Sequence, residues 1–172
     1  MKRLAFAIAA GMALVVSGGS AIAADGGATV ENLSVSFAPL NSDTCPFLPE
    51  GTSITWSGTE KSITRTRTDS SGVTTISNTS HAHGFATDQD GNSYAFNYSN
   101  EFRVTNSAAD PGVFNGSMTD SFSLAGQGPA RLHNGFQASI STDLATFFTF
   151  SDVRSRGDPI DFATGAAHCD PL

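Results

Sequence analysis

Two histidines on one strand face form the clearest metal-ligand pattern in this chain. His81 and His83 are separated by one residue, and such residues of a β-strand point to the same side, ~6.6 Å apart. A zinc site also needs a third protein ligand and an open or filled fourth position, and nothing in the sequence brings another donor close. The pattern therefore favours two surface histidines over a metal site, and we expect no metal or other cofactor. The other donors in the chain are His133, Asp120 and His168.

A single carboxylate, Asp120, interrupts an otherwise apolar row of alternate residues. If that row faces the interior, Asp120 is buried, and a buried carboxylate needs a partner. Such a pair inside a barrel makes Asp120 a candidate catalytic, acid–base residue. The alternatives are a bulge that turns its side chain outward, or a position near the mouth of the barrel. The arginines available as partners are Arg65, Arg67, Arg103 and Arg131.

The segment Asp88-Gln89-Asp90-Gly91-Asn92 resembles the start of a calcium-binding loop. An EF-hand loop requires a carboxylate at its twelfth position, where this chain has Ser99. The segment also separates two strand-like stretches, and Asp-Gly is a common pair in hairpin turns. We therefore predict a turn. The sequence contains no G-x-S-x-G element, P-loop or dinucleotide-binding fingerprint.

Residues 1–24 have the features of a secretory signal peptide. Lys2 and Arg3 precede an apolar run from Leu4 to Val16, and small residues from Ser20 to Ala24 suit a signal peptidase. A retained membrane anchor is the alternative, but the run is shorter than the ~20 residues of a membrane span. We expect a secreted, extracellular protein with no membrane span after cleavage, whose residues 25–172 form one domain.

The expected mature chain is strongly acidic. Without Lys2 and Arg3, 7 basic residues face 16 acidic ones, a net charge of −9. This balance argues against binding to nucleic acid or to an anionic membrane through a positive surface.

The two cysteines are Cys45 and Cys169. Because exported compartments are oxidising, we predict one intramolecular disulfide between them, near the two ends of the domain. Two free thiols or an intermolecular bond are the alternatives.

Alternating apolar and polar residues predict long strands. From Tyr94 to Val104 all bulky apolar side chains fall on even positions, the period of a strand with one buried face. The phase changes after Gly58, which predicts a bulge there or two short strands. The even row either fills the core, its usual role in a small barrel, or lines a ligand pocket. The row comprises Tyr94, Phe96, Tyr98, Phe102, Phe114, Met118 and Phe122.

Strand-like segments joined by turns, with no amphipathic helix of any length, predict an all-β fold. Long strands in meander order suit a closed barrel, which leaves no exposed edge strand. We predict a single antiparallel β-barrel of about eight strands, with a two-sheet β-sandwich as the alternative.

The second half of the chain resembles a group of small secreted actinobacterial β-proteins with two cysteines and no assigned function. The resemblance rests on Phe114-Asn115-Gly116-Ser117, Phe150-Ser151-Asp152-Val153 and the terminal His168-Cys169, between about Val73 and Cys169. It implies no catalytic residues. The expected architecture is also similar to that of dirigent and allene-oxide-cyclase barrels, although the chain has no motif of theirs.

Together these features predict a secreted, non-enzymatic β-barrel that binds a small apolar ligand or a partner protein. One alternative is a barrel enzyme of the cyclase or isomerase type, with Asp120 as its interior carboxylate. The other is a structural or surface-interaction protein without a pocket.

Overall fold

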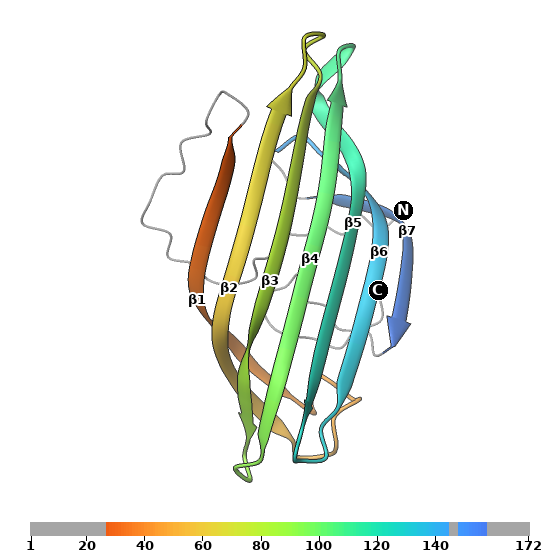
Figure 1. Cartoon of the computed structure of the whole chain (residues 1–172). Coiled ribbons are helices and arrows are strands. Elements are labelled where there is room, and N and C mark those ends of the chain that lie inside the picture. The colour runs from red at the N-terminus through yellow and green to blue at the C-terminus, as the bar shows by residue number, and fades with distance from the viewer. Residues whose placement is uncertain (1–26, 145–147, 158–172) are drawn as a thin grey trace.

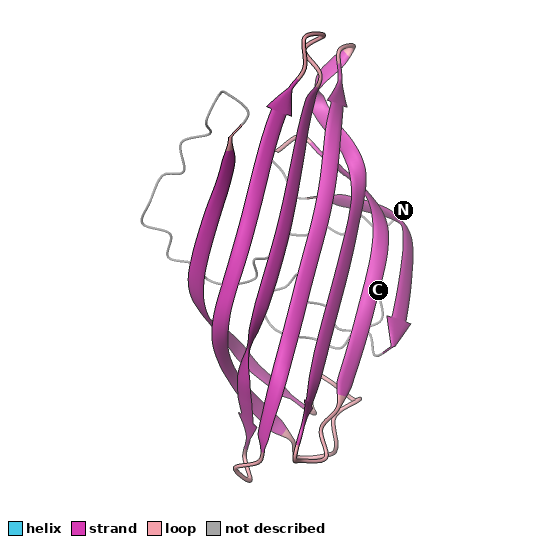
Figure 2. Ribbon diagram, viewed as in Figure 1, coloured by secondary structure: helices cyan, strands magenta, loops and turns pink. Residues whose placement is uncertain are grey.

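Seven β-strands form one antiparallel sheet in the computed structural model, which describes residues 27–144 and 148–157. The strands follow one another across the sheet in chain order (Figure 1). Figure 2 shows strands and connecting loops, without a helix, throughout the described chain. The strands are β1 (Ala28–Asn41), β2 (Ser53–Thr68), β3 (Thr74–Asp88), β4 (Ser93–Ser107), β5 (Asp110–Gly126), β6 (Leu132–Thr142) and β7 (Thr149–Gly157).

The predicted all-β, antiparallel meander is confirmed. The described strands belong to a single sheet, so the alternative of a two-sheet sandwich is wrong. The sheet curls around one face (Figure 1). Within the described residues, however, β1 pairs only with β2 and β7 only with β6, so closure into a barrel stays a prediction.

The predicted signal peptide, residues 1–24, lies outside the described residues. Within the described ranges, no helix is long and apolar enough to cross a membrane.

An unbroken register joins the central strands β2 to β5. Each residue of β3 from Thr75 to Thr87 faces a residue of β2 and a residue of β4, and β4 pairs with β5 from Tyr94 to Asn106 without a shift. The pairing of β5 with β6 from Phe114 to Leu124 is equally free of shifts. Because side chains alternate across a strand, this register places the even-numbered residues of β2 to β6 on one face. That face carries the buried residues of these strands, and we call it the inner face.

Side-chain hydrogen bonds close the turn between β3 and β4. Asp88 Oδ1 accepts hydrogen bonds from the backbone N–H groups of Asp90 at 3.0 Å and Asn92 at 2.9 Å. Asp88 Oδ2 accepts one from the Tyr94 hydroxyl at 2.8 Å, and Gly91 adopts a positive φ of 82°. The segment is the hairpin turn that its sequence predicts.

Two facing glycines make room for an aromatic ring on the inner face. Gly58 and Gly84 lie opposite each other, and a Cβ added to Gly84 would lie 2.2 Å from the Ser57 carbonyl oxygen and 2.8 Å from the Phe96 ring. Strand β2 passes through Gly58 without a register shift, so the predicted bulge or strand break is wrong. The apparent change of phase arises because Ile63 lies on the outer face, half-buried.

Gly84→Ala is expected to destabilise the fold by about 2 kcal/mol, because overpacking a filled site typically costs ~1–3 kcal/mol. Urea unfolding followed by the fluorescence of Trp56, the single tryptophan, measures the change. Gly112→Ala is the control, since its added Cβ meets only Asp110, at 3.9 Å. Equal stability of the two variants would contradict the role of the glycine pair.

Candidate functional site

The core consists of two apolar clusters that follow one another along the strands. We name them the Trp56 cluster and the Phe148 cluster. The Trp56 cluster comprises Leu40, Cys45, Leu48, Ile54, Trp56, Ala82, Ala86, Tyr94, Phe96, Phe122, Leu124, Ala130 and Leu132, with Tyr98 packed against it. The Phe148 cluster comprises Val104, Phe114, Met118, Ala138, Ile140 and Phe148, with the partly buried Ile76, Phe102, Phe136 and Phe150 against it.

The row predicted as core or pocket lining is divided between the two clusters. Tyr94, Phe96 and Phe122 lie in the Trp56 cluster and Tyr98 packs against it. The remaining residues of the row, Phe102, Phe114 and Met118, lie in or against the Phe148 cluster. The whole row therefore points to the inner face.

A belt of polar side chains crosses the inner face between the clusters. Ser62 pairs with Ser80, Ser80 with Asn100, and Asn100 with Asp120, so one lateral row carries polar residues on four neighbouring strands. Three of these four residues are buried. We define the polar belt as Glu60, Ser62, Asn78, Ser80, Asn100, Asp120 and the hydroxyl group of Tyr98.

Hydrogen bonds connect the part of the belt that lies on β2 and β3. Asn78 Nδ2 donates to Ser62 Oγ at 2.9 Å and to Thr64 Oγ1 at 2.8 Å. The hydroxyl oxygens of Ser80 and Ser62 are 2.9 Å apart. Within the described part of the chain, every buried side-chain nitrogen and oxygen has a hydrogen-bond partner. The belt is therefore a satisfied network, the form in which polar groups are tolerated in a core.

Asp120 is a buried carboxyl group at the β5 end of the belt, with 8% of the residue exposed. The Tyr98 hydroxyl donates a hydrogen bond to its Oδ2 at 2.9 Å, and Asn100 Nδ2 lies 3.4 Å from the same oxygen. Burial raises the pKa of Asp120 to about 7, and these hydrogen bonds limit the rise. Near neutral pH the carboxyl group is present in both protonation states, so it can either give or take a proton.

None of the four arginines expected as partners of Asp120 lies beside it, so that prediction is wrong. Arg65, Arg67 and Arg103 are at odd-numbered strand positions on the outer face, Arg131 is in the connection before β6, and all four are exposed. No lysine or arginine of β2 to β6 lies on the inner face, and neutral donors on β4 bind the carboxyl group instead.

Glu60 is the second buried carboxyl group of the belt. Burial raises its pKa, a hydrogen bond with Ser80 reduces the rise, and the negative charge of Glu31 adds to it. Burial and the neighbouring carboxylates of Asp120 and Glu60 also raise the pKa of Tyr98 well above its ordinary value. The surroundings thus favour the neutral form of all three groups.

Sequence reasoning missed the half of the belt that lies on β2 and β3. Glu60 and Ser62 continue the even phase of Ile54 and Trp56. The bulge expected at Gly58 would have interrupted this alternation. When the alternation continues through Gly58 without a shift, Glu60 and Ser62 both lie on the inner face.

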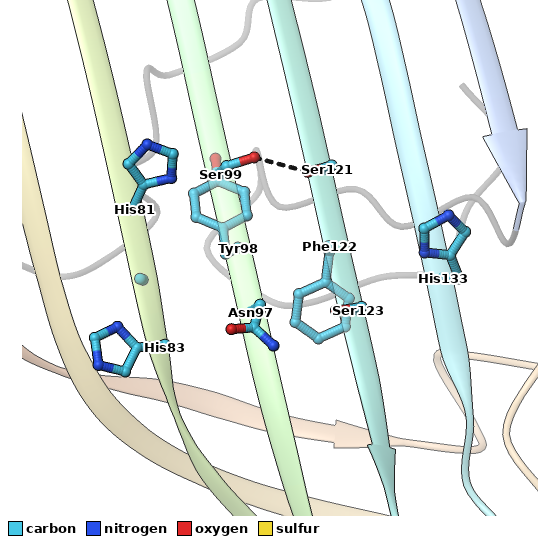
Figure 3. Close-up of a pocket in the computed structure, with 10 residues that line it drawn as sticks. His81, His83, Asn97, Tyr98, Ser99, Ser121, Phe122, Ser123 and His133 are labelled. Atoms are coloured by element: carbon cyan, nitrogen blue, oxygen red, sulfur yellow. Dashed lines mark hydrogen bonds between the residues drawn. The ribbon is translucent and has the colours of Figure 1, made fainter.

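The three histidines considered as metal ligands line one shallow depression of about 200 Å³ on the outer face (Figure 3). His81 and His83 are on β3, whereas His133 is on β6, beyond β4 and β5 (Figure 3). At the usual strand spacing this separation is ~14 Å, so His133 does not join the pair. Residues 27–144 and 148–157 hold no group of three or more metal-binding side chains, and His168 lies outside these ranges.

Cys45 is fully buried in the Trp56 cluster. Cys169 lies outside the described residues, so the disulfide between them stays a prediction.

No protein-family model matches the chain, and no curated protein or solved structure matches it significantly. The resemblance to secreted actinobacterial β-proteins therefore stays a prediction, and the function must be argued from the geometry of the site.

Asp120→Asn is expected to reduce the pH dependence of stability. The wild-type carboxyl group has a pKa of about 7 in the folded protein and ~3.9 in the unfolded chain. Between these values the folded state holds a proton that the unfolded state has lost, so wild-type stability falls as pH rises from about 4 to about 7. The fall amounts to a few kcal/mol, because one pKa unit corresponds to ~1.4 kcal/mol.

Urea unfolding at about pH 4.5 and about pH 8 checks this expectation. Asp120→Asn should be more stable than the wild type by ~2–4 kcal/mol at the higher pH, and the difference should close at the lower pH. Asp110→Asn, an exposed position at the start of β5, should keep the wild-type pH dependence. If Asp120→Asn also keeps it, another group is responsible.

Proposed function

We propose that this chain is an exported, non-enzymatic β-barrel protein that binds a small, largely apolar ligand on its inner face. One observation carries the proposal: partly accessible aromatic side chains of the Phe148 cluster lie beside the hydrogen-bonding groups of the polar belt. Ligand sites in proteins commonly have this composition, mostly apolar with a few polar groups that fix the orientation of the ligand.

The aromatic side chains supply the apolar part of the proposed site. Phe102 and Phe136 are only partly buried. Phe102 packs edge-on against Phe148 with ring centres 5.5 Å apart, and Phe136 packs against Phe150 at 6.3 Å. These contacts hold the rings in place while part of their surface remains open. A ligand that covers this surface gains ~25 cal/mol per Å² of apolar area removed from water.

The polar belt supplies the groups that would orient the ligand. Asn100 offers its amide group, and the protonated Asp120 offers a hydroxyl donor. An anionic ligand would meet two buried carboxyl groups and no lysine or arginine of β2 to β6. The proposed ligand is therefore uncharged or cationic, with at least one hydrogen-bonding group.

Closure of the sheet into a barrel is part of this proposal. The strands wind around the inner face (Figure 1), and closure removes the exposed edges of β1 and β7. A barrel of about eight strands has an interior that side chains fill or that holds one small ligand. Export and the Cys45–Cys169 disulfide, both predicted from the sequence, belong to the same proposal.

Titration with N-phenyl-1-naphthylamine, a neutral aromatic probe that fluoresces in apolar surroundings, tests the proposal. We expect saturable binding of one probe molecule per chain. Phe136→Ala should weaken this binding about tenfold, a loss of ~1.4 kcal/mol, because it removes part of the aromatic surface.

Phe85→Ala is the matched control, since Phe85 is 76% exposed and lies on the outer face. It should leave the affinity unchanged. Absence of saturable binding, or equal losses in the two variants, would refute an inner-face site.

The pKa and the fixed orientation of Asp120 support a second candidate function, that of a barrel enzyme of the cyclase or isomerase type. General acid–base catalysis works best when the pKa of the catalytic group lies near the working pH, and burial raises the pKa of Asp120 to about 7. Its hydrogen bond with Tyr98 holds the carboxyl group in one orientation. Asp120 would take a proton from carbon as the carboxylate and return it as the acid.

Exchange of the α-protons of 2-tetralone in heavy water, followed by proton NMR, tests this candidate. The wild type should exchange them about a hundredfold faster than Asp120→Asn, the usual contribution of a general base. Tyr98→Phe keeps the aromatic ring and removes the hydrogen bond to Asp120. The proton-exchange rate of this variant should therefore change, and the midpoint of its pH dependence should differ from that of the wild type. Equal rates in the wild type and Asp120→Asn would exclude Asp120 as a base and leave the binding proposal untouched.

A further inference from the structure

We propose that His81 and His83 form a two-imidazole site for an exchangeable divalent transition-metal ion, and that this site binds Cu²⁺ most tightly. The two residues lie on the same strand, β3, and both are exposed on the outer face. Figure 3 shows both imidazole rings beside β3 at the edge of the depression. The inference does not depend on the function proposed for the inner face.

The backbone holds the histidine pair at a fixed spacing. Lys61 of β2 and Ser99 of β4 flank His81, while Thr59 and Asn97 flank His83, with no register shift on either side. The separation of i and i+2 residues in such a strand is ~6.6 Å between Cα atoms. Metal–nitrogen bonds are ~2 Å long, so two side chains of this length can turn toward one metal ion between them.

The surroundings of the pair leave room for the remaining metal ligands. The depression continues from the histidines over the small side chains of Asn97, Ser99 and Ser121, and Ser99 and Ser121 are hydrogen-bonded to each other at 2.7 Å. Two protein ligands leave further positions of the metal to water. A site of this kind binds and releases its metal readily, unlike a closed structural zinc site.

The ligand chemistry sets the metal preference. Imidazole suits Cu²⁺, Ni²⁺ and Zn²⁺, and affinity rises along the series to Cu²⁺. Mg²⁺ prefers oxygen ligands and should not bind to the pair. The net charge of −7 for the chain favours a cation, although Lys61 beside His81 opposes it locally. Lys61→Gln should therefore strengthen Cu²⁺ binding about twofold, a surface charge effect of ~0.4 kcal/mol.

Titration of the full chain with Cu²⁺, by calorimetry and electron paramagnetic resonance, tests the proposal. We expect one Cu²⁺ per chain with two nitrogen ligands in its spectrum, weaker Ni²⁺ binding, and none of Mg²⁺. His81→Gln and His83→Gln should each weaken Cu²⁺ binding at least tenfold, about 1.4 kcal/mol. Circular dichroism should show that both variants keep the fold, because both side chains are exposed.

His133→Gln is the matched control, since His133 lines the same depression from β6. This substitution should change the affinity for Cu²⁺ by less than about twofold, because His133 lies ~14 Å from His83 across the sheet. An equal loss in His133→Gln would overturn the two-residue site. A single copper site that survives the double substitution of His81 and His83 would place the metal elsewhere and overturn the proposal.

Discussion

The continuous register of β2 to β5 is the constraint on which the rest of the structure depends. A slip of one residue would turn every side chain of a strand to the opposite face. In the observed alignment, four polar residues form one lateral row between two apolar clusters, and the histidines of β3 point outward. The polar belt and the outer histidine pair are therefore two results of the same alignment, and neither can move without the other.

The polar belt also protects that register. Its carboxyl, amide and hydroxyl groups lie together on the inner face, buried or partly buried. Hydrogen bonds join those of β2 with those of β3, and Asp120 of β5 with Tyr98 and Asn100 of β4. A shifted strand would place an apolar side chain opposite Asp120 or Ser80 and leave a polar group without a partner, at a cost of ~1–3 kcal/mol for each group. The raised pKa of Asp120 reflects the cost of a buried charge: below about pH 7 the carboxyl group keeps its proton, because no lysine or arginine of β2 to β6 lies on the inner face to pair with it.

The inner face could be predicted from the sequence because strand periodicity is a local property. The even positions from Tyr94 to Val104 required no knowledge of neighbouring strands, and the same phase placed Asp120 in the interior. The partners of Asp120 could not be predicted, since its contact with Tyr98 depends on how β4 aligns with β5. Gly58 was misinterpreted for a similar reason: its role lies in contacts with β3 and Phe96, which no pattern within β2 reveals.

The meander order of the strands has a kinetic consequence. Connections of only a few residues join β2 to β3, β3 to β4 and β4 to β5. The entropy lost in closing a loop grows with its length, so these hairpins form at a small cost, and contacts between sequence neighbours favour rapid folding. We therefore expect the chain to assemble outward from its central hairpins, and the polar row from Ser62 to Asp120 to be complete only when β5 has joined.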